Sequence, residues 1–289
     1  MIKTIFIPTA GSNADDAVFA TALEVGQALR AHLNFYHVRQ LVWEAAVRER
    51  HFEFREGPSI NAAVGQVRDD EALHARKARE HAQQFCNAHA IPLLTTPSAA
   101  AGVTAEISEE TGEPAARLIP KARHHDLVVV GRRARDDRMP ANLIELLLVG
   151  SGRPILIAPG QARSFIGRSV VVGWKETPEA ARAVAAAMPL LQAADRVVLV
   201  RVEEDAAAKS PCIDDLAAQL AWHGVGADVR YIPMGRCRAE AALADVAAEV
   251  GAGLLVVGGY GHKPLREAAF GGVTSALVAH ADLPVFMMH

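Results

Sequence analysis

Two patterns of apolar residues alternate along the chain. Short, continuous apolar runs bounded by turn residues are separated by longer stretches in which apolar residues recur at helical spacing. This alternation predicts an α/β fold, and continuous Val/Ile/Leu runs are typical of strands buried on both faces of a parallel sheet. Residues 103–108 instead alternate as an edge strand does. Strands are predicted at residues 4–9, 33–39, 103–108, 126–131, 154–159, 169–174, 196–202, 227–232, 253–258 and 284–289.

The same series of elements occurs twice. Leu-Val-Val-Val-Gly at 127–131 corresponds to Leu-Leu-Val-Val-Gly at 254–258, and Arg-Pro-Ile-Leu-Ile at 153–157 corresponds to Leu-Pro-Val-Phe-Met at 283–287. Each half is therefore predicted as a five-stranded, mostly parallel sheet with helices on both faces. The predicted domains are 1–160 and 168–289, with a linker at about 160–168. Helices are predicted at residues 16–32, 68–90, 113–123, 178–193, 213–223 and 239–250.

The first half is longer because of an insertion at residues 40–66, which carries Trp43, Phe52 and Phe54. A connection of this length is expected to be partly structured or functional. Two interpretations stay open: a flap packed over its own domain, or a surface that contacts a protein partner.

Charge and composition exclude several classes of partner. The net charge of −3 creates no large field of one sign, so we expect neither nucleic-acid nor membrane binding. No apolar run approaches the roughly 18 to 20 residues that span a bilayer, and residues 1–8 read as a strand rather than a signal peptide. Three widely spaced cysteines suggest reduced thiols. We therefore expect a cytoplasmic protein.

Glycines cluster in the stretch that follows the fourth predicted strand of the second half. Glycine lets backbone N–H groups approach an anion, and a short helix predicted at 273–281 would add the donors of its N-terminus. Nearby cations and a hydroxyl could contact phosphate oxygens. The alternative is a tight strand-to-helix connection that binds nothing. The candidate phosphate-binding residues are Gly258, Gly261, His262, Lys263, Gly271, Gly272, Val273 and Thr274.

The first half lacks the corresponding glycines, because Ala141 and Asn142 stand where Gly271 and Gly272 stand in the second. If either half binds a nucleotide, we expect it to be the second. The chain has no P-loop, G-x-G-x-x-G, G-x-S-x-G or H-E-x-x-H motif. The run at 124–126, His-His-Asp, has two interpretations, a solvated helix end or, less favoured, a metal site.

The repeated unit resembles the universal stress protein family. The resemblance is carried by Gly-Gly-Tyr-Gly-His at 258–262, Phe-Gly-Gly-Val-Thr at 270–274 and the ending 283–289, and it covers nearly the whole chain except 40–66. The second half looks like that of the tandem, two-domain bacterial members, and the first half resembles their degenerate first domain. The resemblance implies two Rossmann-like domains of the adenine-nucleotide-alpha-hydrolase type.

The resemblance further implies a stress-response protein that binds ATP or AMP, with or without Mg²⁺, and has at most a weak ATPase activity. In such a site Trp174 and Lys175 would lie near the base and Val202 near the ring or ribose, with the glycines and Thr274 at the ribose and phosphates. Lys175, and Ala10 in the first half, replace the acidic residue usual after the first strand.

Family members pair through their last strands, and tandem members can make this pairing between their own halves. A compact monomer and a homodimer both stay open. The alternative function is an adaptor or chaperone-like protein that binds no nucleotide and contacts a protein partner through the 40–66 insertion.

Overall fold

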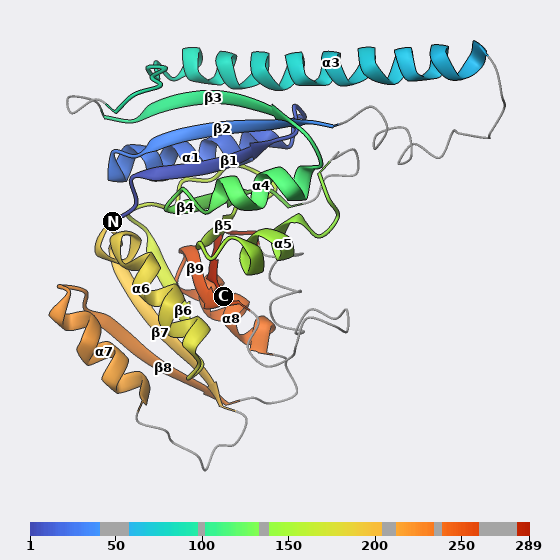
Figure 1. The fold of residues 1–289 in the computed structure, drawn as a ribbon. Helices are drawn as coiled ribbons and strands as arrows, with labels where there is room; N and C mark the ends of the chain where they lie inside the picture. Colours follow the sequence, from blue (N-terminus) through green and yellow to red (C-terminus); the bar gives the residue numbers. More distant parts are fainter. Residues whose placement is uncertain (41–57, 98–101, 133–138, 204–211, 234–238, 260–281) are drawn as a thin grey trace.

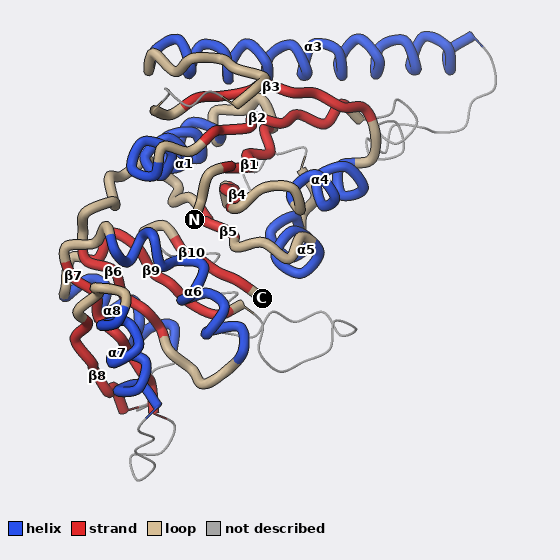
Figure 2. The backbone as a smooth tube through the Cα atoms, turned by 60° about the vertical axis from the view of Figure 1, so that its left-hand side comes forward, coloured by secondary structure: helices blue, strands red, loops and turns tan. Residues whose placement is uncertain are grey.

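The described strands form one continuous sheet. The computed structural model describes residues 1–40, 58–97, 102–132, 139–203, 212–233, 239–259 and 282–289. The sheet has ten strands in the order β3-β2-β1-β4-β5-β10-β9-β6-β7-β8, with helices on both faces (Figures 1 and 2). We call residues 1–160 the first half and residues 167–289 the second half.

Both halves follow the predicted order of strands, and the first half has one helix, α5, that was not predicted. The short helix predicted at 273–281 lies outside the described residues. The elements of the first half are β1 (Thr4–Thr9), α1 (Asp15–Leu29), β2 (His32–Arg39), α3 (Pro58–Ala88), β3 (Thr104–Thr111), α4 (Pro114–Ala122), β4 (Leu127–Val130), α5 (Leu143–Gly150) and β5 (Ile155–Ile157). Those of the second half are β6 (Ser169–Gly173), α6 (Pro178–Gln192), β7 (Arg196–Glu203), α7 (Cys212–Trp222), β8 (Ala227–Pro233), α8 (Ala239–Glu249), β9 (Ala252–Gly258) and β10 (Val285–Met288).

The two halves are joined through their last strands, as the resemblance implied. Strands β5 and β10 pair antiparallel, with Phe286 opposite Leu156. The other neighbouring strands of the described sheet run parallel. Strand β3, predicted as an edge strand, does lie at one end of the sheet. The two predicted five-stranded sheets therefore form a single sheet.

Each face of this sheet carries one apolar core that spans both halves. One core packs strand residues such as Ile5 and Phe286 against α1, α3, α6 and α7. The other packs strand residues such as Phe6 and Met287 against α4, α5 and α8. Successive strand residues point to opposite faces, so the unbroken apolar runs supply both cores at once.

The linker between the halves is held against the first half by one carboxylate. Glu24 of α1 accepts hydrogen bonds from the Ser164 hydroxyl at 2.7 Å and from the N–H groups of Phe165 at 2.8 Å and Ile166 at 3.0 Å. The Phe165 side chain is buried in the core that contains α1. The linker is therefore an ordered part of the fold.

Two helices differ from the sequence-based expectation. The 31-residue helix α3 begins at Pro58, ten residues before the predicted start, so part of the 40–66 insertion is helical. This confirms that the insertion is partly structured, and α3 runs along the β3 edge of the sheet (Figure 1). Trp43, Phe52 and Phe54 lie outside the described residues. Helix α5 was not predicted, because its nearly continuous apolar sequence lacks a visible helical period.

The interpretation of residues 124–126 as a solvated helix end is wrong for His125. Its neighbour His124 is exposed, but the His125 ring is buried against Phe6 with 5.0 Å between ring centroids. The ring Nδ1–H donates to the Lys121 carbonyl oxygen at 3.0 Å, and burial lowers the pKa of His125. Within the described part of the chain, no group of three or more His, Cys, Asp or Glu side chains could hold a metal ion.

Two further findings concern the thiols and membrane contact. Cys86 is a free, buried thiol whose pKa is raised by burial to about 11, consistent with a packing role. Cys237 lies outside the described residues. Of the helices that the structure describes, none is both long and apolar enough to cross a membrane.

Replacing Phe286 tests the junction between the halves. Because Phe286 is fully buried beside β5, we expect Phe286→Ala to lower the free energy of unfolding by about 3 to 5 kcal/mol. Trp222, which is 91% exposed, provides the control, and Trp222→Ala should change the stability by less than about 0.5 kcal/mol. Urea denaturation measures both. Equal effects of the two substitutions would contradict a junction that supports the whole sheet.

The hydrogen bonds of the Asp126 carboxylate predict that the stability of the folded protein depends on pH. Its carboxylate accepts hydrogen bonds from the N–H groups of Lys3 and Thr4 and from the Thr4 hydroxyl, which tie β1 to β4. Partial burial alone would raise the pKa of Asp126, but these hydrogen bonds and the charge of Arg153 lower it overall. The stabilisation is thus complete above the ordinary carboxyl pKa and is lost as the pH falls through the lowered value.

We expect Asp126→Asn to cost about 1 to 2 kcal/mol at pH 7, since partial exposure weakens hydrogen bonds to a charged group. The difference from the unsubstituted protein should shrink toward pH 2, as measured by urea denaturation across the pH range. A difference that does not change with pH would contradict the role assigned to this carboxylate.

Candidate functional site

The strand order of the second half reverses next to β6. The chain passes from β6 to β7 and β8 on one side, then returns to β9 and β10 on the other. In sheets of this kind, ligands bind beyond the carboxyl ends of the strands at the point of reversal. We call the carboxyl ends of β6, β7 and β9 the β6–β9 edge.

Trp174 is the first residue beyond β6 at this edge. Its backbone N–H donates to the Val200 carbonyl oxygen of β7 at 2.8 Å, and its half-buried side chain packs on the core. The indole Nε1 is buried, and it has no hydrogen-bond partner within the described part of the chain. A buried donor without an acceptor costs about 1 to 3 kcal/mol, so an acceptor at this position would be favourable.

The end of β9 lies directly against the start of α6. A Cβ atom on Gly258 would stand 2.6 Å from the Ala180 backbone nitrogen and 3.0 Å from its Cα. Glycine is therefore needed here for packing, whether or not a ligand binds. In the first half, a Cβ on Gly131 would meet the Val18 side chain of α1 at 2.9 Å. The glycine that ends the fourth strand thus has an architectural role in both halves.

Helix α6 starts beside the same edge. Thr177 caps it, with its hydroxyl accepting from the Ala180 N–H at 3.3 Å, and Pro178 occupies the first turn. In that turn Glu179 forms an ion pair with Arg182 at 3.1 Å. Partial burial would raise the pKa of Glu179, but its hydrogen bonds and the charges of Arg182 and His289 lower it overall. The edge therefore carries an ionised carboxylate that the sequence analysis did not identify.

The structure places four of the predicted site residues and leaves seven outside its description. Trp174 follows β6, exposed Lys175 follows Trp174, half-buried Val202 lies near the end of β7, and Gly258 ends β9. Because Gly173 is paired with both Val200 and Val257, these strand ends lie side by side. The predicted residues outside the described part of the chain are Gly261, His262, Lys263, Gly271, Gly272, Val273 and Thr274.

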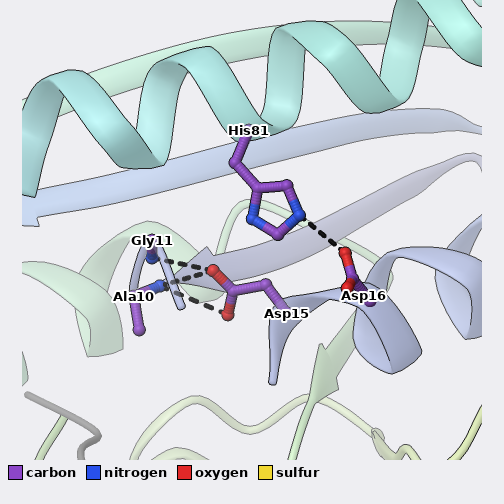
Figure 3. Close-up of polar contacts among 5 residues, drawn as sticks. All are labelled: Ala10, Gly11, Asp15, Asp16 and His81. Atoms are coloured by element: carbon purple, nitrogen blue, oxygen red, sulfur yellow. Dashed lines mark hydrogen bonds and ion pairs between the residues drawn. The ribbon is translucent and has the colours of Figure 1, made fainter. Parts of the chain in front are cut away.

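The equivalent edge of the first half is filled by its own side chains. After β1, the N–H groups of Ala10 and Gly11 donate to the Asp15 carboxylate at 3.1 and 2.8 Å (Figure 3). A Cβ on Gly11 would lie 3.0 Å from the Ala78 backbone nitrogen of α3. Helix α3 is also tied to α1, since the His81 Nε2 lies 2.6 Å from the Asp16 carboxylate. The donors that would face a ligand here already have an internal acceptor.

Sequence reasoning missed the role of Asp15. The available signal was a pair of aspartates that opens a helix directly after the turn at residues 10–13. Acidic residues in the first helical turn are stabilised by the helix dipole. Their hydrogen bonds back to the preceding loop, however, depend on how that loop folds.

The comparisons with known proteins concern the second half and the overall fold. The sequence pattern of the Universal stress protein family matches residues 167–289. None of the curated proteins matches the chain.

Solved structures resemble the whole chain. A universal stress protein from Archaeoglobus fulgidus DSM 4304 is 16% identical, covers 98% of this chain and 97% of its own, and has a TM-score of 0.71. A functionally unknown protein from Pseudomonas aeruginosa PAO1 is 11% identical over 99% of this chain and 92% of its own, with a TM-score of 0.54. These two likenesses show that the α/β fold recurs over almost the full length.

A universal stress protein in complex with cAMP is 17% identical over 55% of this chain and 99% of its own, with a TM-score of 0.36.

Replacing Gly258 separates packing from ligand binding. We expect Gly258→Ala to destabilise the protein by about 1 to 3 kcal/mol without any ligand, because the new methyl group meets backbone atoms of α6. Gly160→Ala is the control, since nothing lies within 4 Å of a Cβ built there. Thermal melts of both variants check this. Unchanged stability of Gly258→Ala would contradict the close packing of β9 on α6.

Proposed function

We propose that this chain, whose residues 167–289 match the Universal stress protein family, is a stress-response protein that binds ATP or AMP at the β6–β9 edge. The observation that carries the proposal is the reversal of strand order beside β6. Trp174, the first residue beyond β6, has a buried Nε1 without a hydrogen-bond partner among the described residues. We assign the nucleotide to a domain at residues 168–289, with residues 1–160 as its structural partner.

The chemistry of the residues at this edge supports an adenine nucleotide. Adenine offers ring nitrogens that accept hydrogen bonds, and Trp174 offers both an indole N–H and an aromatic face. Lys175, exposed beside it, supplies positive charge for a phosphate. In the sequence that follows Gly258, further glycines with His262, Lys263 and Thr274 complete a composition suited to phosphate contacts.

The corresponding edge of the first half supports assigning the nucleotide to the second half. The N–H groups of Ala10 and Gly11 already donate to Asp15, and α3 packs on Gly11. A nucleotide there would have to displace an internal carboxylate and a long helix. The β6–β9 edge has Lys175 at the position that corresponds to Ala10.

We propose binding with at most weak hydrolysis. Catalysis of phosphoanhydride hydrolysis in ATP needs a nucleophile or water held by a base, or carboxylates that hold a metal. The described side chains at the β6–β9 edge do not form such a set, since Glu179 is engaged by Arg182. Mg²⁺ would enter with ATP as its counter-ion. We also assign the protein to the cytoplasm.

Calorimetric titration with ATP plus Mg²⁺, AMP and cAMP tests the proposal on the full chain. We expect one saturable site for an adenine nucleotide. At 100 times its Kd the ligand should add about 2.7 kcal/mol to the stability of the native state, seen as a shift in Tm. A Trp43→Phe, Trp222→Phe background would leave Trp174 as the only tryptophan, and its fluorescence should change on binding.

A pair of matched variants tests the position of the site. Gly271→Asp places a carboxylate among the proposed phosphate contacts and should abolish binding. Ala141→Asp places the same charge at the corresponding position of the first half and should leave the affinity unchanged. Equal affinity of both variants would overturn the proposed site. No heat and no melting shift at millimolar nucleotide would overturn nucleotide binding and favour an adaptor that acts through a protein partner.

A further inference from the structure

A cavity lies at the other end of the second half's strands. It has a volume of about 250 Å³ and is lined by the linker, by the start of β9 and by the residues that precede β10. A cavity of this size has room for roughly eight water molecules. Because β6 and β9 run parallel, their amino ends and the β6–β9 edge lie at opposite ends of the strands. The cavity is therefore separate from the proposed nucleotide site.

The linker forms one wall of this cavity with a tight turn. The three hydrogen bonds to Glu24 hold residues 164–166, and the Phe165 ring is buried in the core that contains α1. The turn is closed by the Arg168 N–H, which donates to the Phe165 carbonyl oxygen at 3.3 Å, and Gly167 adopts a φ of +75°. This reversal brings Arg163 and Arg168 to the same cavity.

A β-bulge forms the adjoining wall. Ser169 pairs with Ala252 and Val170 pairs with Leu254, so Gly253 is an extra residue in β9. A Cβ on Gly253 would lie 2.8 Å from the Phe165 carbonyl oxygen and 2.9 Å from the Arg168 Cβ. Bulges are frequent beside binding sites, because they interrupt the regular pairing of backbone groups. Here the glycine lets the linker turn pack directly on the strand.

Two arginines and one aspartate are the charged residues that line the cavity. The guanidinium groups of Arg163 and Arg168 take part in no ion pair or hydrogen bond with the described residues, whereas Arg153, Arg182 and Arg196 do. Asp282 also lines the cavity. It raises the pKa of Arg132, although burial lowers that pKa overall, and Arg132 donates to the Leu283 carbonyl oxygen at 3.5 Å. The cavity thus offers two guanidinium groups that have no partner among the described residues, together with one carboxylate.

We propose that this cavity binds a small phosphate monoester that also carries hydroxyl groups. Guanidinium groups bind phosphate oxygens through paired, charge-assisted hydrogen bonds. A carboxylate accepts hydrogen bonds from hydroxyl groups and repels a bare anion. Arg163 and Arg168 therefore take the phosphate, and Asp282 takes a hydroxyl group of the ester. A polyol phosphate of three to five carbons is the ligand class that satisfies both requirements within this volume.

Titration of the full chain with glycerol 3-phosphate tests the proposal, with inorganic phosphate and glycerol as reference ligands. We expect glycerol 3-phosphate to bind more tightly than either reference. The variant Arg163→Ala, Arg168→Ala should weaken its binding by at least about tenfold, because two charge-assisted contacts are lost. The control Arg68→Ala, Lys77→Ala removes the same charge from the exposed face of α3 and should leave the affinity unchanged.

Asp282→Asn separates a specific site from a general attraction for anions. This variant should bind inorganic phosphate at least as well as the unsubstituted protein does, but should lose the preference for glycerol 3-phosphate. Gly271→Asp should leave glycerol 3-phosphate binding intact, which distinguishes this cavity from the proposed nucleotide site. Circular dichroism and thermal melts confirm that each variant is folded.

Two results would overturn the proposal. One is an equal loss of affinity for glycerol 3-phosphate in the double arginine variant and in the α3 control. The other is an equal affinity for inorganic phosphate and glycerol 3-phosphate in the unsubstituted protein.

Discussion

The antiparallel pairing of β5 with β10 is the interaction on which the rest of the structure depends. Each of these strands would otherwise be an exposed apolar edge, since Leu156 and Phe286 face each other across the pairing and both are fully buried. Unpaired edges of this kind invite association with other chains. By joining them, the chain forms one ten-stranded sheet, and each apolar core extends across both halves.

The direction of this pairing also decides where the two proposed sites lie. All described strands of one half run parallel, and the two halves run opposite to each other. The β6–β9 edge and the corresponding edge of the first half therefore face in opposite directions. The amino ends of β9 and β10, with the arginine-lined cavity, lie on the side to which the first half's strands point. Arg132 spans this boundary, since it follows β4 and donates to the Leu283 carbonyl oxygen before β10.

The two halves share an architecture but differ at the carboxyl ends of their first strands, β1 and β6. Gly131 and Gly258 both end a fourth strand beside the first helix of their half, so packing explains both. The loop after β1, in contrast, is held by Asp15 and covered by α3, while the loop after β6 presents Trp174 and Lys175. This difference supports our proposal that a nucleotide binds in the second half rather than in the first.

The sequence by itself determined the elements and their repetition. The apolar runs located β1 at its observed bounds and the other strands to within a few residues. The signal was strongest for strands buried on both faces, such as β4, because such a strand is apolar throughout. The glycines after β9 and the replacement of Gly271 by Ala141 in the other half also favoured one half as the ligand site. Only the tertiary structure decided how Asp15, His125 and Arg168 are used. Their roles depend on contacts with residues whose position no local pattern encodes, as when His125 packs on Phe6 and the Arg168 turn packs on Gly253.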